Sequence, residues 1–403
     1  MRQIEEILSV NNQKHLLSYM DRMNSSSLGK FKRDIESIDF SLFDSAVKKQ
    51  DTRINDDIYP AYVLKISDRE VVCDRYNKLG LDTLKNNKVA ALLLAGGMGS
   101  RLGSLKPKGM LNVGIETDLS LFKIHIENIK RITNLIGRKL YLFVMVSNEN
   151  HKDTIGFFKA NDYFNYDSEY IKFFIQSELP TLDQDNSLLM KDENCLLKTP
   201  DGNGNFYSSM VSAGYDKILI DQKIEWLNVF SIDNVLQNIF DPVFIGSVIN
   251  ASVNCGAKVV KKVIPYENVG TICRFGDVMK VIEYYDLPEC LANEVDKDGN
   301  YNYGYGVTLN YLLHTEALRE INKKDLPLHK VEKKLKCWDI NGFIKEITGY
   351  KFEYLLTDLV EVLKTCLPFE IIREKEFAPI KNLTGVDSLE SAREALIKNG
   401  YKI

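Results

Sequence analysis

The sequence predicts an α/β fold: a doubly wound, mixed but mainly parallel sheet, with a helical segment before it and a short tail after it. The first observation behind this prediction is the unbroken apolar run Val89–Ala95, which ends in glycines. Such a run is typical of a strand that is buried on both faces and stops at a tight loop. The second observation is that strand-like and helix-like stretches alternate after this run, as they do in parallel sheets covered by helices.

Pattern and composition divide the chain into three parts. We expect a helical N-terminal segment over 1–85, a core over 86–372 and a short C-terminal segment over 373–403. In the first part, the stretch Gly29–Lys49 has the pattern of two helices separated by a break near Asp39. We expect this part to pack as a layer or brace and assign no chemistry to it.

The core elements follow from the period of the apolar residues. Amphipathic helices are expected at Leu119–Ile132 and Asn150–Ala160. The expected strands are Leu140–Ser147, Ile171–Gln176 and Trp226–Ile232, with a pair at Val269–Arg274 and Val281–Tyr285. Near the C-terminus, Asp387 and Glu390 have the spacing of a capping box, which predicts a last helix that ends near Gly400.

Composition excludes several classes of protein. The 403 residues carry a formal net charge of −4, without the basic face that nucleic-acid-binding proteins present. No apolar run approaches the ~18 residues of a membrane span, and the acidic start Met1–Glu6 lacks the apolar core of a signal peptide. The seven cysteines include no Cys-x-x-Cys pair, which favours reduced thiols in the cytoplasm and argues against zinc.

A glycine-rich loop, Gly96–Gly103, follows the first core strand. Glycines let the backbone turn sharply, and successive N–H groups in such a loop form a nest that suits a phosphate. Two cations lie close by, Arg101 with a planar guanidinium and Lys108 with a mobile point charge. The Walker pattern is excluded because Gly103 is not followed by Lys and then Ser or Thr. The dinucleotide fingerprint is weakened because three residues, instead of two, separate the second and third glycines.

Polar residues at the ends of later strands extend this phosphate site, because ligands of such sheets bind at the carboxyl ends of strands. Asp233 follows the strand expected at Trp226–Ile232. Mg²⁺ takes one or two carboxylates and completes its shell with phosphate oxygens and water, so Asp233 is the candidate ligand for Mg²⁺, with Mn²⁺ as the alternative. Gln176 ends another strand, and its amide has the donor and acceptor needed to read an imide edge.

The loop reads Gly-Gly-x-Gly-x-Arg-x-Gly followed by Pro-Lys, and this pattern resembles the signature of sugar nucleotidyltransferases. The version Pro107–Met110 is similar to that of the UDP-N-acetylhexosamine pyrophosphorylases, within the UDP-sugar pyrophosphorylase family. The likeness extends over nearly the whole chain, through Pro200–Tyr207, Cys255–Lys258, Gly349–Glu353 and Arg373–Asn382. It implies a Rossmann-like, GT-A-like nucleotidyltransferase core that acts on UTP and N-acetylglucosamine 1-phosphate. We expect a monomer or weak homo-oligomer.

The resemblance also implies a role for each matched residue. The phosphate groups are contacted by the cations Arg101, Lys108 and Lys381. The nucleotide is bound by Gly96, Gly97, Gln176, Gly202 and Lys351, and the sugar by Asn203, Gly270 and Glu283. In the implied reaction, a sugar phosphate oxygen attacks the α-phosphorus of UTP in line, and diphosphate leaves. Catalysis is then positioning and charge neutralisation, with no general base.

The sugar end departs from the family pattern. Members open the next strand with Asn-Ala-Gly-Asn, whose first asparagine contacts the sugar, whereas this chain has Asn-Tyr-Gly-Tyr-Gly over 302–306. A gapless match puts Gly304 at the asparagine position, and a two-residue shift puts Asn302 there, so both are candidates. Leu355 and Thr357 stand where members have aromatics. Because the chain stops at Ile403, we expect the small C-terminal domain of the family to be trimmed.

Two other functions stay open. The departure at Gly304 keeps a uridylyltransferase that uses glucose or galactose 1-phosphate, although Cys255–Lys258 favours the N-acetylhexosamine branch. The more distant alternative is a protein of the same fold that binds UTP or a UDP-sugar without turnover. The sequence does not distinguish N-acetylglucosamine from N-acetylgalactosamine.

Overall fold

The computed structural model describes residues 2–48, 58–321 and 325–403. Their contacts separate into two units. The first consists of the described residues of Met1–Arg53, Ser177–Asn205 and Leu326–Leu355, and the second of those of Ile54–Gln176, Phe206–Asp325 and Leu356–Ile403. The three-part division expected at residues 85 and 372 stays a prediction, because a contact unit need not be a part of the chain that folds alone.

A mixed sheet of ten described strands forms the centre of the second unit. Its parallel half has the order β9 (Trp226–Ser231), β3 (Val89–Leu94), β4 (Leu142–Val146) and β5 (Ile171–Ile175). Beside β9 lies the antiparallel strand β13 (Tyr305–His314), followed by the hairpin of β11 (Thr271–Phe275) and β12 (Val278–Ile282). The other strands are β10 (Cys255–Lys261), β16 (Cys366–Glu370) and β2 (Ile58–Pro60). The sheet confirms the predicted α/β fold.

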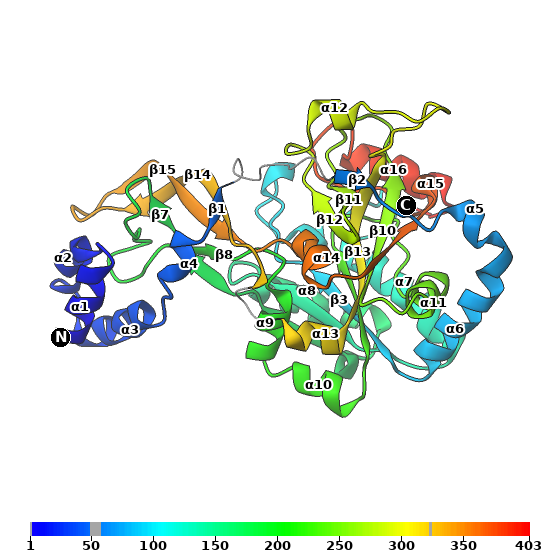
Figure 1. Cartoon of the computed structure of the whole chain (residues 1–403). Coiled ribbons are helices and arrows are strands. Elements are labelled where there is room, and N and C mark those ends of the chain that lie inside the picture. The colour runs from blue at the N-terminus through cyan, green and yellow to red at the C-terminus, as the bar shows by residue number, and fades with distance from the viewer. Residues whose placement is uncertain (1, 49–57, 322–324) are drawn as a thin grey trace. The chain divides into compact units, whose positions relative to one another are not determined.

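Helices cover both faces of the parallel strands, as Figure 1 shows for α7 and α11 on one side of β3 and for α9 and α10 on the other. Alternate residues of β3, such as Val89 and Leu93, pack into the same apolar cluster as α7 (Leu121–Ile136), α8 (His151–Ala160), α11 (Pro242–Asn250) and α16 (Leu389–Lys398). On the other face, the Phe143 ring of β4 lies 6.1 Å from the ring of Tyr215. Tyr215 precedes α10 (Asp216–Asp221), which follows α9 (Phe206–Ser212). The predicted doubly wound arrangement is therefore confirmed.

Two glycines let α6 (Cys73–Lys85) cross α11 at close range. A Cβ atom on Gly80 would lie 1.9 Å from the carbonyl oxygen of Pro242, and one on Gly246 would lie 2.0 Å from that of Tyr76. Any side chain at either position would force the helices apart. The remaining helices of this unit are short: α5 (Ile66–Arg69), α12 (Glu289–Ala292), α13 (Thr315–Glu320), α14 (Leu359–Val362) and α15 (Arg373–Glu376).

The first unit combines helices with a small sheet. Its helices are α1 (Arg2–Val10), α2 (Leu17–Met20), α3 (Ser25–Glu36) and α4 (Ser41–Asp44). The sheet order is β1 (Val47–Lys48), β14 (His329–Trp338), β15 (Ile344–Glu353) and β7 (Leu182–Asp183), and β6 (Glu178–Pro180) pairs with β8 (Lys198–Pro200). The pair α3 and α4 confirms the helix, break and helix predicted around Asp39. The second helix was predicted too long, because it ends at Asp44 and Val47–Lys48 pair with β14 as strand β1; Lys49 lies outside the described residues.

The last helix, α16, begins later than predicted. Its N-cap is Ser388, whose Oγ accepts a hydrogen bond from the backbone N–H of Ser391 at 3.2 Å. The capping box predicted at Asp387 was therefore wrong by one residue. Asp387 instead has a φ of +56°, and its backbone oxygen accepts a hydrogen bond from the N–H of Lys381 at 2.6 Å. The helix ends at Lys398, close to the predicted Gly400.

Candidate functional site

The glycine-rich loop leaves the carboxyl end of β3 and folds back on itself. The N–H of Gly99 donates to the carbonyl of Lys106 at 3.0 Å, and the N–H of Lys108 donates to that of Gly97 at 3.1 Å. At the tip, Gly103 has a φ of +70°, a conformation that glycine adopts without strain. The exposed side chain of Arg101 projects from the short turn before this glycine.

Lys108 and Asp233 meet where β3 and β9 end. The Lys108 Nζ lies 2.6 Å from Asp233 Oδ1, and the two side chains are 12% and 28% exposed. Because β3 and β9 are parallel neighbours, the segments that follow them reach the same edge of the sheet. Gly109 anchors the lysine, since a Cβ atom there would lie 2.1 Å from the Phe122 ring of α7. The structure thus brings together a cation and a carboxylate that were predicted separately.

Gln176 lies against the start of the same loop. It follows β5, its N–H donates to the carbonyl of Val146 at 2.7 Å, and it is 8% exposed. A Cβ atom on Gly96 would lie 2.9 Å from the Gln176 Oε1, so the amide packs directly against the glycine backbone. The structure therefore places two of the predicted nucleotide-binding residues in contact.

Sequence reasoning missed Asn150, whose side chain forms a hydrogen bond with the backbone just before the glycine-rich loop. Its side chain is fully buried, and its Nδ2 donates to the carbonyl of Ala95 at 2.9 Å. Its Oδ1 accepts a hydrogen bond from the N–H of Ser147 at 2.9 Å. The signal that could have found it is its place just after β4, where an asparagine has local backbone groups to bond.

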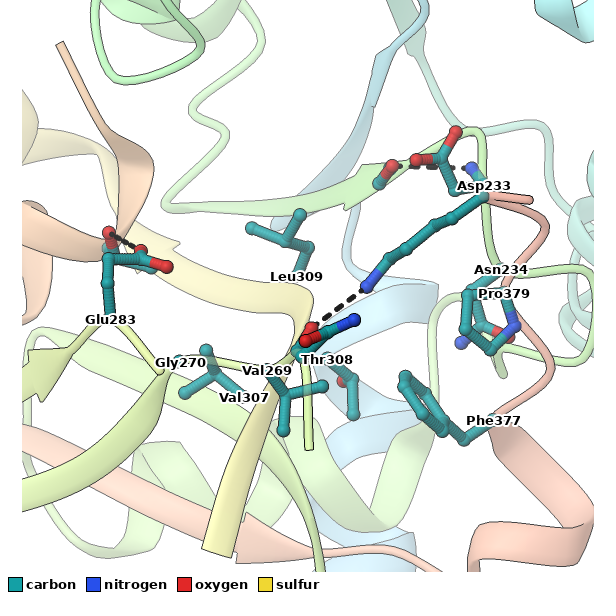
Figure 2. Close-up of a pocket in the computed structure, with 14 residues that line it drawn as sticks. Asp233, Asn234, Val269, Gly270, Glu283, Val307, Thr308, Leu309, Phe377 and Pro379 are labelled. Atoms are coloured by element: carbon teal, nitrogen blue, oxygen red, sulfur yellow. Dashed lines mark hydrogen bonds between the residues drawn. The ribbon is translucent and has the colours of Figure 1, made fainter. Parts of the chain in front are cut away.

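A pocket of about 140 Å³ contains four of the predicted site residues. Figure 2 shows Glu283 at one end and Asp233 and Asn234 at the other. Glu283 accepts a hydrogen bond from Thr357 Oγ1 at 3.4 Å, and Lys381 Nζ donates to the carbonyl of Asn268 at 3.3 Å. The lining residues are Ser231, Asp233, Asn234, Asn268, Val269, Gly270, Glu283, Val307, Thr308, Leu309, Thr357, Phe377, Pro379 and Lys381.

Asn302 and Gly304 are not in this pocket. Both line a second hollow of about 400 Å³, where Asn302 Nδ2 donates to Glu294 Oε1 at 2.7 Å. The N–H of Val307 donates to the carbonyl of Gly270 at 2.9 Å, so the register of β13 sets residue 307 beside the pocket. The contribution of β13 to the pocket is Val307, Thr308 and Leu309.

Asn234, which sequence reasoning gave no role, ties together the segments that carry Asp233 and Lys381. Its Nδ2 donates to the carbonyl of Glu376 at 2.7 Å, and its Oδ1 accepts from the N–H of Ala378 at 2.8 Å. Beside it, the N–H of Ile380 donates to the carbonyl of Asp233 at 3.0 Å. The chain over 376–380 is therefore hydrogen-bonded to the turn after β9. The signal in the sequence was an asparagine that follows the strand-end aspartate.

Three predicted residues belong to the first unit: Gly202, Asn203 and Lys351. Gly202 has a φ of +91°, and a Cβ atom there would lie 2.2 Å from the carbonyl oxygen of Tyr354, so only glycine fits this close approach. Lys351 lies on β15 and forms an ion pair with Glu353, two residues along the same face of the strand.

His125, on α7, supports the backbone that leads to Asp233. The side chain is 1% exposed, and its Nε2 lies 3.1 Å from the carbonyl oxygen of Ile232. Burial lowers the pKa of His125 from 6.5 to about 4, so the ring is neutral at pH 7 and Nε2–H donates to that oxygen.

We expect this histidine to make the protein sensitive to acid. The unfolded chain takes up a proton near pH 6.5 and the folded chain does not until about pH 4, so the stabilisation is complete above 6.5 and lost as the pH falls. The free energy of unfolding should drop by about 3 kcal/mol from this group between pH 7 and 4. Urea unfolding of the wild type and of His125→Gln at both pH values measures it. An equal drop in the variant contradicts the assignment.

Two structural observations bear on metals and membranes. Among the described residues, no group of three or more His, Cys, Asp or Glu side chains is arranged to hold a metal ion. A protein site for Mg²⁺ here would therefore rest on few carboxylates, as is common for metals bound together with phosphates. Within the same residues, no helix has the length and apolar content needed to span a membrane.

Comparisons with known proteins agree with one another. The family model described as UTP–glucose-1-phosphate uridylyltransferase matches residues 40–396. The chain is 32% identical to the UDP-N-acetylglucosamine pyrophosphorylase of Saccharomyces cerevisiae over 98% of its own length and 86% of the relative. It is also 32% identical to UDP-N-acetylhexosamine pyrophosphorylase-like protein 1 of Mus musculus, over 81% of this chain and 68% of that one.

Solved structures share the fold. The crystal structure of the uridine diphosphate N-acetylglucosamine pyrophosphorylase from Trypanosoma brucei, in complex with an inhibitor, superposes with a TM-score of 0.79 at 24% identity. The match covers 98% of this chain and 83% of that one. The UDP-glucose pyrophosphorylase of Leishmania major, solved as a point mutant in complex with UDP-glucose, gives a TM-score of 0.62 at 17% identity, over 83% and 70% of the two chains.

Proposed function

The chain belongs to the UTP–glucose-1-phosphate uridylyltransferase family, and we propose that it is a UDP-N-acetylglucosamine diphosphorylase. It transfers a uridylyl group from UTP to N-acetyl-D-glucosamine 1-phosphate, giving UDP-N-acetyl-D-glucosamine and diphosphate. The names of relatives that match 81–98% of the chain support this substrate. The observation that carries the proposal is the meeting of Lys108 and Asp233 where the glycine loop and β9 end, 2.6 Å apart.

The reaction needs placement and charge more than proton transfer. A phosphate oxygen of the sugar 1-phosphate forms a bond to the α-phosphorus of UTP, and the bond from that phosphorus to the bridging oxygen breaks as diphosphate leaves. The nucleophile is already anionic, so no side chain must take its proton. Lys108 neutralises the α-phosphate, Arg101 the leaving diphosphate and Lys381 the attacking phosphate. Preorganised cations of this kind stabilise the charge that develops in the transition state.

Asp233 is the residue that would hold a divalent cation. Its carboxylate is partly exposed at the pocket, and Mg²⁺ is usually held by one or two carboxylates together with substrate phosphates. When bound, Mg²⁺ would supply positive charge to the substrate phosphates, and Mn²⁺ is the alternative ion. Lys108 forms an ion pair with the same carboxylate.

The remaining contacts follow the same proposal. Gln176 reads the imide edge of uracil beside the backbone of Gly96 and Gly97, and Glu283, beside Gly270, accepts hydrogen bonds from sugar hydroxyls. Gly202 and Lys351 stay candidates for contact with the nucleotide, and Asn203 stays a candidate for contact with the sugar. Asn302 or Gly304 remains a candidate for contact with the sugar. We also propose that the enzyme works in the cytoplasm, which its seven free cysteines support. We further propose a monomer or weak homo-oligomer.

Glucose 1-phosphate is a second candidate substrate because of one observation. The side of the pocket formed by β13 carries Val307, Thr308 and Leu309, and none of these three side chains has an amide that could bond to the acetamido group of the sugar. The small Thr357, which contacts Glu283, stands where family members carry an aromatic.

The deciding experiment measures diphosphate release from UTP and Mg²⁺ with three sugars in parallel: N-acetylglucosamine, N-acetylgalactosamine and glucose 1-phosphates. We expect kcat/KM for N-acetylglucosamine 1-phosphate to exceed that for glucose 1-phosphate by at least about 10–200-fold, because an apolar pocket discriminates that much for one methylene and the acetamido group is larger. Equal or reversed preference assigns a broader uridylyltransferase. UTP binding without turnover of any sugar assigns a binding protein.

A further inference from the structure

A lysine on the central sheet lies at the centre of a buried ion cluster outside the pocket. Lys258 is on β10, and its side chain is 1% exposed. Its Nζ lies 2.8 Å from Asp241 Oδ2 and 2.6 Å from Glu376 Oε2, and it donates to the carbonyl of Asn238 at 3.2 Å. These three acceptors satisfy the three N–H donors of the ammonium.

Electrostatics keep this lysine charged. Burial alone lowers the pKa of a lysine, but the carboxylates of Asp241 and Glu376 outweigh it and raise the pKa of Lys258 above its usual value. Removing only one partner of a buried ion pair strongly destabilises a folded protein, because the other partner is left as an unpaired charge. The position of each carboxylate is therefore coupled to the ammonium.

The two carboxylates have different surroundings. Asp241 is the N-cap of α11, and its Oδ1 accepts hydrogen bonds from the N–H groups of Val243 and Phe244 at 3.0 and 3.3 Å. It is thus fixed to the core. Glu376 is the last residue of α15 and begins the segment 376–381, which carries Lys381. Lys258 therefore links this segment to the sheet.

The segment forms one side of the pocket. Phe377, Pro379 and Lys381 all line it, and Figure 2 shows Phe377 and Pro379 on the same side as Asn234. The segment is also bonded to the turn after β9 through Asn234 and Asp233, and Lys381 itself bonds to Asp387 and Asn268. The Lys258–Glu376 contact adds an anchor in a regular strand, which is more rigid than a turn.

We propose that Lys258, acting through Glu376, is a positioning residue for the sugar 1-phosphate: it sets the place of the segment 376–381 and hence of the Lys381 ammonium. This inference rests on the proposed function, in which Lys381 holds the attacking phosphate. Lys258 touches neither substrate. Its loss should weaken binding of the sugar phosphate and leave binding of UTP unchanged.

The first test uses a matched pair of variants at the carboxylate end, where Lys258 and Asp241 remain paired and the fold is protected. Glu376→Gln keeps an acceptor for the ammonium, whereas Glu376→Met has similar length and none. We expect Glu376→Met to raise KM for N-acetylglucosamine 1-phosphate by about tenfold, with the Kd for UTP within twofold. Glu376→Gln should retain most of the affinity that the methionine variant loses. Lys258→Met should resemble Glu376→Met if it folds.

The control is Lys261→Met on the same strand. The Lys261 side chain is 63% exposed and 3.8 Å from Glu370, a geometry in which an ion pair contributes little. Lys261→Met makes the same replacement as Lys258→Met and leaves the ion cluster of Lys258 unchanged. Its KM values should equal those of the wild type.

A second readout needs no substrate. The N–H groups of Ala378 and Ile380 are bonded to Asn234 and Asp233, so hydrogen exchange at these amides reports whether the segment is held. We expect exchange about tenfold faster in Glu376→Met than in the Lys261→Met control, with β3 and β4 unchanged.

The outcomes separate the claims. Exchange equal to that of the control overturns the anchoring role. Faster exchange with an unchanged KM overturns the link to the sugar phosphate. An equal rise in the Kd for UTP overturns the specificity of the effect for one substrate. Absence of turnover by the wild type overturns the proposed function and the part of the inference that depends on it, while the exchange result still decides the anchoring.

Discussion

Lys108→Ala should lower kcat by about 10²–10³-fold in a protein that stays folded. Its ammonium lies beside Asp233 at the end of the glycine loop, where the α-phosphate is proposed to bind. Removing one group that stabilises transition-state charge typically costs ~3–4 kcal/mol. The fold should tolerate the change, since the Asp233 side chain that loses its partner is 28% exposed and keeps contact with water. Arg101→Ala should fall in the same range. Diphosphate release and the thermal unfolding midpoint measure the two effects.

The same loop supplies the control for this prediction. Lys106 is two residues from Lys108 and its side chain is exposed, so Lys106→Ala removes an equal charge from the same surface. We expect its kcat to stay within about twofold of the wild type, because the proposal gives Lys106 no contact with a phosphate and its exposed charge is screened by solvent. Near-wild-type turnover by Lys108→Ala or Arg101→Ala would contradict the proposal that the cations of the glycine loop bind the substrate phosphates.

Asp233→Asn should reduce both the rate and the response to Mg²⁺. Asparagine keeps the shape of the side chain and removes the charge that a hard divalent cation prefers. We expect kcat to fall by about 10²–10³-fold. The Mg²⁺ concentration at half-maximal rate should rise by at least about 10–100-fold, the loss common when even an outer partner of a metal is changed. Steady-state rates over a Mg²⁺ titration at saturating UTP measure both quantities.

A distant aspartate controls for the loss of one negative charge. Asp221 is exposed at the end of α10, and Asp221→Asn should have wild-type rates and Mg²⁺ response. If Asp233→Asn also keeps the wild-type Mg²⁺ response, Asp233 is not the metal ligand. A large loss of rate without any change in the Mg²⁺ titration would leave Asp233 only as the partner of Lys108.

The sequence predicts the neighbourhood of the glycine loop and Asp233 for a local reason. Val89–Ala95 is apolar without interruption and Gly96–Gly103 follows it at once, so the strand end and the loop can both be located. Once β3 and β9 are recognised as strands of a parallel sheet, the residues after them must share an edge. This rule alone puts Asp233 near the loop, as observed.

The side of the pocket formed by β13 could not be predicted in the same way. Its composition depends on the register of β13 against β11, which pairs Thr271 with Gly306. A shift of one or two residues along β13 changes which side chains meet the pocket, and no local pattern fixes that register. Sequence matching therefore left Asn302 and Gly304 as candidates, whereas the residues of β13 that line the pocket are 307–309.

Two further features were not visible in the sequence. The hairpin of β14 and β15 was not predicted because β14 buries only Val331 and Cys337, so its apolar residues do not alternate as those of a half-buried strand do. The cluster of Lys258 was visible only as a motif that resembles one branch of the family. Its partners Asp241 and Glu376 are 17 and 118 residues away, and such pairing is decided by tertiary packing.

The hydrogen bonds between the chain over 376–380 and the turn after β9 affect the order in which the parts of the enzyme fold. The bonds from Asn234 to Glu376 and Ala378 join residues 142 and 144 apart in sequence. Closing so long a loop is slow, since its entropy is lost before the contacts are gained. During synthesis, β3, β4, β5 and β9 emerge well before residue 376, so their apolar core can collapse first. Catalytic competence therefore arrives late, when the final stretch of the chain closes over a sheet that has already folded.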